Sequence, residues 1–238
     1  MAMANNYFSF KEFTINQEKA AFKVGTDGVL LGAIANVEGK KRVLDIGAGT
    51  GLISIMLAQR CDADIVSLEP DYESFLQAEE NVAQCKWKNR IKVINSDLQK
   101  FTGVDKKFDL IVTNPPYFSN SLKNPDPRKS SVRHNDSLDS DDLLSGVKRL
   151  LDNKGIFQLI MPYAEGTIFI AHAQQYGLFC NSILKIRPLP TVEIRRLILT
   201  FSLAKLKLTE KFLTIERGAR HEFTDDYKAL TKDFYLKF

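Results

Sequence analysis

A run of glycines beside a carboxylate is the first group of residues whose types and spacing suit chemistry. The segment VLDIGAGTGL places Gly47, Gly49 and Gly51 between a predicted strand and a predicted helix, with Asp45 just upstream. Glycines at such a junction let the backbone turn tightly and approach a ligand closely. A dinucleotide-binding loop would read G-x-G-x-x-G and hold a pyrophosphate, which the Asp45 carboxylate would repel. The loop instead indicates a positively charged amino group, as in the methionine moiety of S-adenosylmethionine.

Two acidic residues end the next two predicted strands. Glu69 follows 18 residues after Gly51, where a carboxylate can accept both ribose hydroxyls of a nucleoside, and Asp97 is placed to accept an adenine amino group. Taken singly, the glycine turn is also typical of a plain strand-to-helix connection, and either carboxylate could cap a helix. Three such features at successive carboxyl ends of strands favour a nucleoside-binding cleft, because open α/β sheets bind ligands there.

The tetrapeptide Asn114, Pro115, Pro116 and Tyr117 ends the fourth predicted strand. Consecutive prolines fix the backbone and lack N–H donors, which leaves carbonyl oxygens available as acceptors. An aromatic amino group is a poor nucleophile because its lone pair is delocalised into the ring. We expect the Asn114 side-chain oxygen and the Pro115 carbonyl to accept its hydrogens and hold it in line with a methyl donor. Tyr117 is expected to stack on the planar acceptor. The alternative is a Pro-Pro turn with a buried tyrosine.

Short apolar runs alternate with helix-like segments from Arg42 onward, which is the pattern of βαβ units and a parallel sheet. Two long runs, 179–190 and 193–203, are joined by a short Pro-containing turn and are therefore expected to be antiparallel. We predict an α/β, Rossmann-like fold with a mostly parallel seven-stranded sheet, a C-terminal antiparallel hairpin and helices on both faces. A further hairpin is expected between Tyr7 and Val24.

One domain spanning residues 1–238 accounts for the length of the chain. Within it we expect an N-terminal extension (1–40), a catalytic sheet core (41–206) and a C-terminal tail (207–238). The composition, 44% hydrophobic and 26% charged, excludes disordered and fibrous classes. No apolar run is long enough to cross a membrane and no export signal is evident. Three scattered cysteines favour a reducing, cytosolic compartment and no metal site.

Basic residues are concentrated in the last quarter of the chain. Residues 181–238 hold 12 Lys and Arg against 7 Asp and Glu, whereas residues 1–180 hold 21 against 22. This asymmetry suggests a polyanionic partner, although an excess of this size is also common on an ordinary solvated surface. The segment 118–140, which has no periodicity, adds further basic residues. The residues predicted to contact nucleic acid are Lys123, Arg128, Lys129, Arg133, Arg195, Arg196, Arg217 and Arg220.

The order of these motifs resembles the class I amino-methyltransferases that act on adenine N6. The segment FKVGTDGVLLGA, residues 22–33, looks like motif X of that class, and the glycine loop, Glu69, Asp97 and NPPY follow in the order of its motifs I to IV. With the further segments KIRPLP, RRLILTF and LTKDFYLKF, the chain is similar to the bacterial tRNA adenine-N6 methyltransferases that modify adenine 37, beside the anticodon, in a valine tRNA. The resemblance implies tRNA as substrate and S-adenosylmethionine as cofactor. It also implies a cofactor site lined by Phe22, Thr26 and Asp27 together with Asn114.

Other interpretations stay open at this stage. NPPY also serves enzymes that methylate a guanine amino group, an adenine in DNA or a protein glutamine amide, and the C-terminal basic excess favours nucleic acid among these. A non-catalytic RNA-binding module on the same fold is disfavoured by the complete set of motifs. A nicotinamide-dependent dehydrogenase would need the G-x-G-x-x-G spacing and a second substrate-binding region. No obligate protein partner is indicated.

Overall fold

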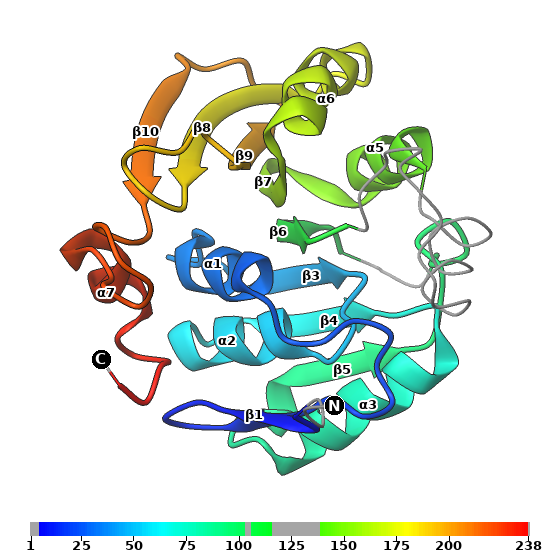
Figure 1. The fold of residues 1–238 in the computed structure, drawn as a ribbon. Coiled ribbons are helices and arrows are strands. Elements are labelled where there is room, and N and C mark those ends of the chain that lie inside the picture. Colours follow the sequence, from blue (N-terminus) through cyan, green and yellow to red (C-terminus); the bar gives the residue numbers. More distant parts are fainter. Residues whose placement is uncertain (1–4, 103–105, 116–138, 238) are drawn as a thin grey trace.

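The computed structural model describes residues 5–102, 106–115 and 139–237, which form a twisted sheet with helices on both faces (Figure 1). The α/β fold predicted from the sequence is confirmed. The predicted strands between Arg42 and Ser202 are all present, within a few residues of their expected bounds. The strands of the main sheet are β3 (Arg42–Ile46), β4 (Asp64–Leu68), β5 (Ile91–Ile94), β6 (Phe108–Thr113), β7 (Leu151–Pro162), β8 (Phe179–Arg187), β9 (Arg196–Ser202) and β10 (Thr209–Thr214).

The main sheet has eight strands in the order β10-β8-β9-β7-β6-β3-β4-β5. The strands from β3 to β7 are parallel, and β9 lies antiparallel between β7 and β8. The predicted C-terminal hairpin is therefore confirmed. Because the chain adds β4 and β5 on one side of β3 and β6 and β7 on the other, the strand order reverses beside β3. Open α/β sheets bind ligands at the carboxyl ends of strands at such a point.

The edge strand β10 lies within residues 207–238, which were predicted from the sequence to form a C-terminal tail. It pairs parallel to β8, from Thr209 opposite Ser182 to Thr214 opposite Arg187. Leu213 is the one buried residue of this strand, so its sequence lacks the apolar run that marks the inner strands. A strand held at an edge mainly by backbone hydrogen bonds leaves little hydrophobic pattern to recognise. The sheet consequently has one strand more than the seven expected.

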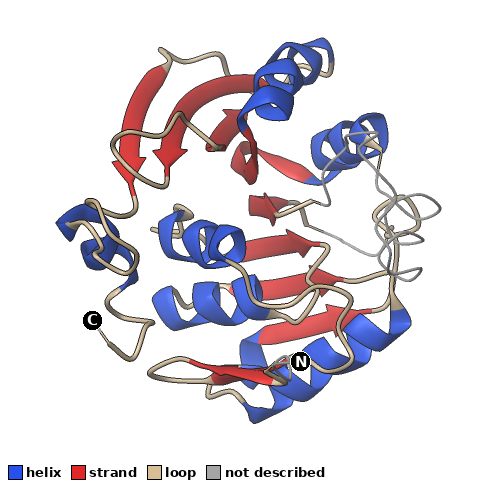
Figure 2. Ribbon diagram, in the orientation of Figure 1, coloured by secondary structure: helices blue, strands red, loops and turns tan. Residues whose placement is uncertain are grey.

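Helices cover both faces of the sheet (Figure 2). Buried side chains of α1, α2, α3 and α7 share one hydrophobic cluster with strand residues such as Val112. Helices α5 and α6 share a second cluster around Leu44 and Phe157 on the other face. Within the described part of the chain, no helix is long and apolar enough to span a membrane. The described helices are α1 (Thr26–Ile34), α2 (Leu52–Arg60), α3 (Tyr72–Gln84), α5 (Ser140–Leu150), α6 (Tyr163–Gln175), α7 (Asp225–Thr231) and a short 3-10 helix (Lys88–Arg90).

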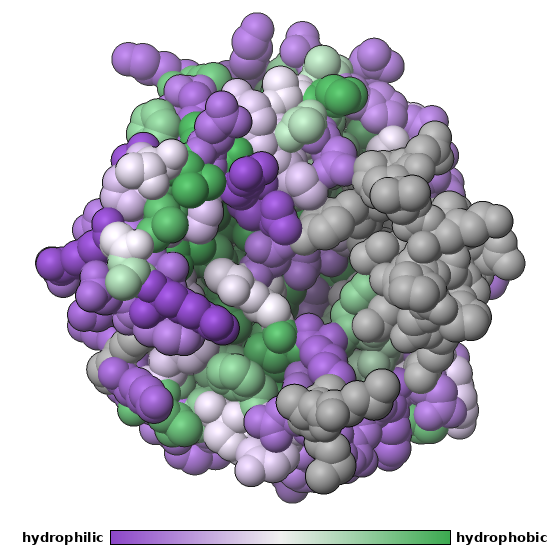
Figure 3. Space-filling model, viewed as in Figure 1, coloured by the Kyte–Doolittle hydropathy of each residue, from purple (hydrophilic) through white to green (hydrophobic). Residues whose placement is uncertain are grey.

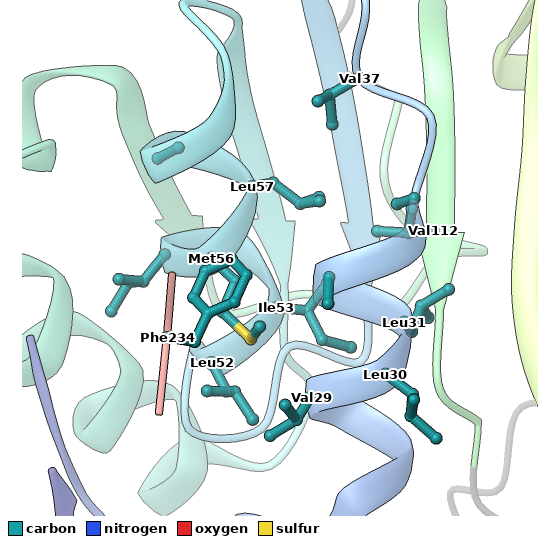
Figure 4. Packing of buried hydrophobic residues seen from close by; sticks show 14 of the residues in the cluster. Val29, Leu30, Leu31, Val37, Leu52, Ile53, Met56, Leu57, Val112 and Phe234 are labelled. Carbon is teal, nitrogen blue, oxygen red and sulfur yellow. The ribbon is translucent and has the colours of Figure 1, made fainter. Parts of the chain in front are cut away.

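Helix α1 contains most of residues 22–33, the segment that resembles motif X and for which no helix was predicted. Residues 28–33 are all buried, so this segment has no polar face from which a helical period could be recognised. The helix packs closely on α2, since a Cβ at Gly32 would lie 2.7 Å from Met56 Sδ. Figure 4 shows Val29 and Leu52 facing each other where the two helices meet. The core thus holds the body of α1 firmly against α2.

A small antiparallel hairpin precedes α1. It consists of β1 (Tyr7–Ser9) and β2 (Thr14–Asn16) and is shorter than the hairpin expected between residues 7 and 24. The Asn16 N–H donates to Asn81 Oδ1, and Asn81 Nδ2 donates back to Asn16 O, both at 2.8 Å. This pair of hydrogen bonds anchors the hairpin to α3, so that residues 17–25 run across the end of the sheet toward α1.

Candidate active site

A cleft of about 870 Å³ opens at the carboxyl ends of β3, β4 and β6. Its walls come from the segment before α1, the glycine loop, the residues after β4 and β6 and the start of β9. A cavity of this order accommodates a nucleoside-sized ligand. On the face shown in Figure 3 the described residues are mostly hydrophilic, and hydrophobic residues show between them rather than as one broad patch. The predicted site residues that line the cleft are Phe22, Thr26, Asp27, Gly47, Gly49, Glu69, Asp97, Asn114, Pro115 and Arg196.

The glycine loop forms an open backbone cradle in this cleft. Gly47 and Gly49 have φ angles of 73° and 57°, which residues with a side chain rarely adopt. Among the described residues, no protein atom would lie within 4 Å of a Cβ at either position. The Gly47 and Ala48 N–H groups both donate to Leu68 O at 2.9 Å. The loop is therefore fixed to β4, while the space beside its glycines is free for a ligand.

Asp45 and Gly51 lie behind the cleft rather than in its wall. Asp45 is fully buried, and its Oδ2 accepts a hydrogen bond from Ser54 Oγ, which also contacts Ser67 Oγ, both at 2.6 Å. Burial raises the pKa of Asp45 to about 6, although the hydrogen bond from Ser54 opposes that rise. Gly51 caps α2 with φ of 80° and lies against Ala78. Asp45 Oδ1 has no hydrogen-bond partner among the described residues, and the predicted contact between Asp45 and a ligand amino group stays a prediction.

Glu69 follows β4 directly and lies in the cleft with 7% of its surface exposed. Its Oε2 accepts the Gly49 N–H at 2.7 Å, and its Oε1 accepts the Asp71 N–H at 2.9 Å. Burial raises the pKa of Glu69 to about 7, and the two backbone hydrogen bonds oppose this rise. The carboxylate joins the glycine loop to the turn before α3. Each oxygen retains a lone pair that can accept a hydroxyl of a ligand.

Asp97 lies across the cleft from the glycine loop, in the segment that follows β5. Its carboxylate pairs with Lys100, three residues further along, and its side chain is 31% exposed. Asn95 Nδ2 donates to Glu69 O at 2.8 Å and to Pro70 O at 3.0 Å, which ties this segment to the end of β4. The carboxylate that was predicted to accept a purine amino group therefore lies in a polar part of the wall.

The first turn of α1 forms the N-terminal wall. The Phe22 ring is 37% exposed and lies on the cleft, as do Thr26 and Asp27. Asp27 Oδ2 accepts a hydrogen bond from Arg196 Nε at 2.8 Å. The structure therefore brings together the motif X residues that the family resemblance implied. Arg196, which was assigned to nucleic acid, is an unexpected member of this wall.

Asn114 and Pro115 continue from the end of β6 into the cleft. Asn114 is half-buried and Pro115 is buried. Just before them, Thr113 Oγ1 donates to Ile46 O at 2.8 Å, so the end of β6 is fixed to the end of β3. The side-chain amide and the following carbonyl are thus held beside the glycine loop by the sheet itself. Two predicted members of this motif lie outside the described residues, namely Pro116 and Tyr117.

Gly28 belongs to the site but was not singled out from the sequence. A Cβ at this position would lie 3.2 Å from Leu52 Cδ2 and 3.9 Å from Asn114 Nδ2. The first turn of α1 therefore contacts both the first residue of α2 and the amide that was predicted to hold the acceptor. The available sequence signal was the second glycine of GTDG, which is also compatible with an ordinary loop.

The described basic residues of the C-terminal region do not behave alike. Arg195 is exposed just before β9, whereas its neighbour Arg196 lines the cleft. Arg217 and Arg220 are exposed in the segment that follows β10, and Arg217 pairs with Asp225. The remaining residues predicted to contact nucleic acid lie outside the described residues, namely Lys123, Arg128, Lys129 and Arg133.

The segment after β10 runs beside the turn between β8 and β9. The Ile215 N–H donates to Arg187 O at 3.0 Å, and the Glu216 N–H donates to Pro188 O at 2.9 Å. These bonds bring two arginine-bearing segments together near the start of β9, although more than twenty residues separate them in sequence. Arg187 joins this group and was missed as a candidate, since a single arginine in KIRPLP carries no signal of its own. Throughout the described ranges, no group of three or more potential ligand side chains is arranged to hold a metal ion.

Comparisons with known proteins agree with this geometry. A family model described as "Methyltransferase small domain" matches residues 19–135. A tRNA1(Val) (adenine(37)-N6)-methyltransferase of Bacteroides thetaiotaomicron is 45% identical over 236 residues, which is 98% of this chain and 99% of that protein. A predicted O-methyltransferase from Agrobacterium tumefaciens has a TM-score of 0.69 at 21% identity, over 87% of this chain and 96% of that chain. The glycopeptide N-methyltransferase MtfA, solved with S-adenosyl-L-methionine, has a TM-score of 0.53 at 13% identity, over 76% of this chain and 88% of that chain. The two structural likenesses show a shared fold.

Proposed function

The chain belongs to the tRNA1(Val) (adenine(37)-N6)-methyltransferase family, and on that basis we propose that it transfers a methyl group from S-adenosylmethionine to N6 of adenine 37 in that tRNA. The observation that carries the proposal is the placement of Asn114 and Pro115 in the same cleft as the open glycine cradle. An acceptor amine and a methyl donor can therefore meet in this cleft. A tRNA substrate also agrees with the cytosolic location expected from the cysteine content.

The residues of the cleft fit S-adenosylmethionine. The cradle at Gly47 and Gly49 has room that a Cβ would fill and that no protein atom occupies. The Glu69 carboxylate, at the end of β4, accepts the two ribose hydroxyls through its remaining lone pairs. Asp97 accepts the adenine amino group, and the Phe22 ring adds apolar surface to the same cavity. When bound, the cofactor supplies an electrophilic methyl group on a sulfonium sulfur.

Asn114 and Pro115 act on the nucleophile. Asn114 Oδ1 and Pro115 O accept hydrogen bonds from the two N6 hydrogens, which concentrates the lone pair on nitrogen and points it at the methyl carbon. The bound cofactor would supply the methyl group for the new N–C bond and leave as a neutral thioether, and N6 would lose one proton to solvent. Both acceptors stabilise the positive charge that develops on N6 before that proton leaves. Positioning and electrostatics therefore supply most of the rate enhancement.

The exposed arginines beside the cleft support a polyanionic substrate. Arg195, Arg217 and Arg220 come from the start of β9 and from the segment after β10, which the hydrogen bonds to Arg187 and Pro188 bring together. Phosphate contacts from such residues hold a nucleic acid in register without reading its bases. We refer to the surface formed by Arg187, Arg195, Arg217 and Arg220 as the arginine surface. It places the phosphate backbone of the RNA beside the cleft into which the flipped adenine inserts.

The proposal is tested by incubating the protein with radiolabelled S-adenosylmethionine and total tRNA from a strain that lacks this enzyme, followed by digestion to nucleosides. Label is expected in N6-methyladenosine of tRNA1(Val), at position 37. Asn114→Ala is expected to lower the single-turnover rate by about 10²-fold or more, because one acceptor of the developing charge is lost. Calorimetry should show that this variant still binds the cofactor. Absence of label in RNA from a protein that binds the cofactor would instead favour a protein amide or DNA acceptor.

A further inference from the structure

An ion pair joins two elements of the cleft that lie far apart in the sequence. Arg196 Nε, at the start of β9, donates to Asp27 Oδ2, in the first turn of α1, at 2.8 Å across a separation of 169 residues. The two side chains are 30% and 19% exposed. An exposed pair of this kind would contribute little. Partial burial strengthens this one and makes the loss of either partner costly, because a partly buried charge would lose a counterion.

The two ends of this ion pair are held very differently. Arg196 belongs to a strand that pairs on both sides, opposite Pro162 of β7 and Ile186 of β8. Its Nη1 also donates to Arg195 O at 3.0 Å. Asp27, in contrast, lies at a helix start whose N-cap residue, Gly25, makes no side-chain capping hydrogen bond. The strand is therefore the fixed partner, and the first turn of α1 is the element whose position the ion pair sets.

The first turn of α1 matters because it borders both the proposed cofactor site and Asn114, which is proposed to hold the acceptor base. Thr26 and Asp27 line the cleft beside the glycine loop. Gly28 lies against Asn114, since a Cβ there would come 3.9 Å from Asn114 Nδ2. The residues that follow in the helix are buried, with Val29 facing α2 (Figure 4), so a shift would be confined to this first turn. A small displacement of this turn would move two things at once. It would shift the wall of the cleft beside the glycine loop, and it would shift the surface that supports the Asn114 side-chain amide.

We infer that Arg196 is a positioning residue, which acts through Asp27 to hold the first turn of α1 against the cofactor and Asn114. This role differs from the phosphate contact first assigned to Arg196 and still assigned to Arg195. Adjacent residues near the start of a strand project to opposite sides, and the structure shows Arg195 exposed and Arg196 in the cleft. The inference rests on the proposed function for its effect on methylation, but its effect on cofactor binding is independent of the acceptor.

The test uses Arg196→Gln and Arg195→Gln as a matched pair, because the two changes remove the same charge from neighbouring residues. Arg196→Gln is expected to weaken S-adenosylmethionine binding, measured by calorimetry without RNA, by about tenfold, and to lower kcat at saturating tRNA. The salt dependence of tRNA binding should stay as in the unmodified protein. Arg195→Gln should leave the cofactor dissociation constant unchanged and reduce the slope of log K against log salt by about 0.9.

Two further variants separate positioning from general damage to the fold. Asp27→Asn keeps the shape of the side chain and should reproduce the loss of cofactor affinity. The double variant Asp27→Asn/Arg196→Gln should lose no more than either single variant, since both act through one contact. Arg196→Lys, which keeps the charge, should recover part of the affinity. Thermal unfolding of each variant confirms that it is folded.

The outcomes are distinct. A reduced salt slope for Arg196→Gln with an unchanged cofactor dissociation constant would overturn the inference and return Arg196 to the RNA-contacting group. Fully additive losses in the double variant would overturn it as well. If every variant behaved as expected toward the cofactor while the protein failed to methylate tRNA, the proposed acceptor would be wrong and the positioning role of Arg196 would stand.

Discussion

Two regions near the start of β9 are built in different ways. One is the cofactor wall, which comprises the glycine loop, Glu69 and the first turn of α1, and the other is the arginine surface. The cofactor wall is made largely of backbone: the glycine loop donates to Leu68 O and to Glu69, whose carboxylate is buried. The arginine surface is made of side chains at the end of β8 and on the connections after β8 and β10, of which Arg195, Arg217 and Arg220 are exposed and Arg187 is half-buried. The first holds one small ligand in a single geometry, whereas the second meets a large, charged substrate. Substitutions should therefore have large, localised effects on the wall and small, salt-dependent effects on the surface.

The largest effect is expected at Asp45, a fully buried carboxylate that lies behind the cofactor wall. Its pKa is raised from 3.8 to about 6, so the folded protein binds this proton more tightly than the unfolded chain does. The free energy of unfolding therefore falls as the pH rises through this range, by about 3 kcal/mol from this group. Asp45→Asn removes the titration. Urea denaturation should show the variant gaining stability relative to the unmodified protein between pH 4 and 7.

The exposed Asp62 provides the control for this measurement. Asp62→Asn makes the same chemical change at an exposed position and should not reproduce the gain expected for Asp45→Asn. A stability difference for Asp45→Asn that stayed constant over this pH range would show that the buried carboxylate is not the source of the pH dependence.

The next largest effect is expected at Glu69, where the same burial acts on ligand binding. Glu69→Ala removes the acceptor of the ribose hydroxyls and of the Gly49 N–H, and should weaken cofactor binding by about 100-fold. Because the pKa of Glu69 is raised to about 7, the ionised acceptor becomes fully available only above that pH. Cofactor affinity should therefore rise between pH 6 and 8. Glu69→Gln should bind more weakly with no such rise, and a parallel rise in that variant would assign the pH dependence to another group.

A pair of glycines distinguishes backbone strain from ligand contact. Gly49 and Gly39 both have positive φ, 57° and 68°, and a Cβ would meet no protein atom within 4 Å at either. Gly49→Ala and Gly39→Ala should each lower the free energy of unfolding by about 1 kcal/mol. Only Gly49→Ala should also weaken cofactor binding, by about tenfold, because its methyl group enters the cradle. Equal cofactor affinity in the two variants would show that the cradle is not where the ligand lies.

The smallest effects belong to the arginine surface. Arg220→Gln should weaken tRNA binding several-fold at low salt and reduce its salt dependence by about one phosphate contact. The cofactor dissociation constant should not change. Lys154, exposed near the amino end of β7, is the control, and Lys154→Gln should leave the salt slope unaltered. If both substitutions changed the slope equally, the arginine surface would have no special part in RNA binding.

The difference between the two regions also explains which features sequence reasoning could find. The glycine loop, Glu69, Asp97 and Asn114 were predicted to share one site, and the structure places all of them at the cleft. Each lies at the carboxyl end of a strand, and parallel strands bring such ends to one edge of the sheet. The exceptions were Gly51, which lies against Ala78 of α3, and Asp45, whose Oδ2 accepts a hydrogen bond from Ser54 of α2 behind the cleft.

The sequence by itself thus determined the α/β class, the order of the inner strands along the chain and the motifs at their ends, because those features depend on local hydrophobic pattern and on short fixed spacings. The tertiary structure alone decided the pairing of β10 with β8, the contact of Gly28 with Asn114 and the separation of Arg196 from Arg195. Each of these depends on which distant segments meet in space. The Asp27–Arg196 ion pair shows the physical reason, because its two residues are 169 positions apart in the sequence. Strand order and helix packing set its geometry, and the local sequence around either residue does not predict the contact.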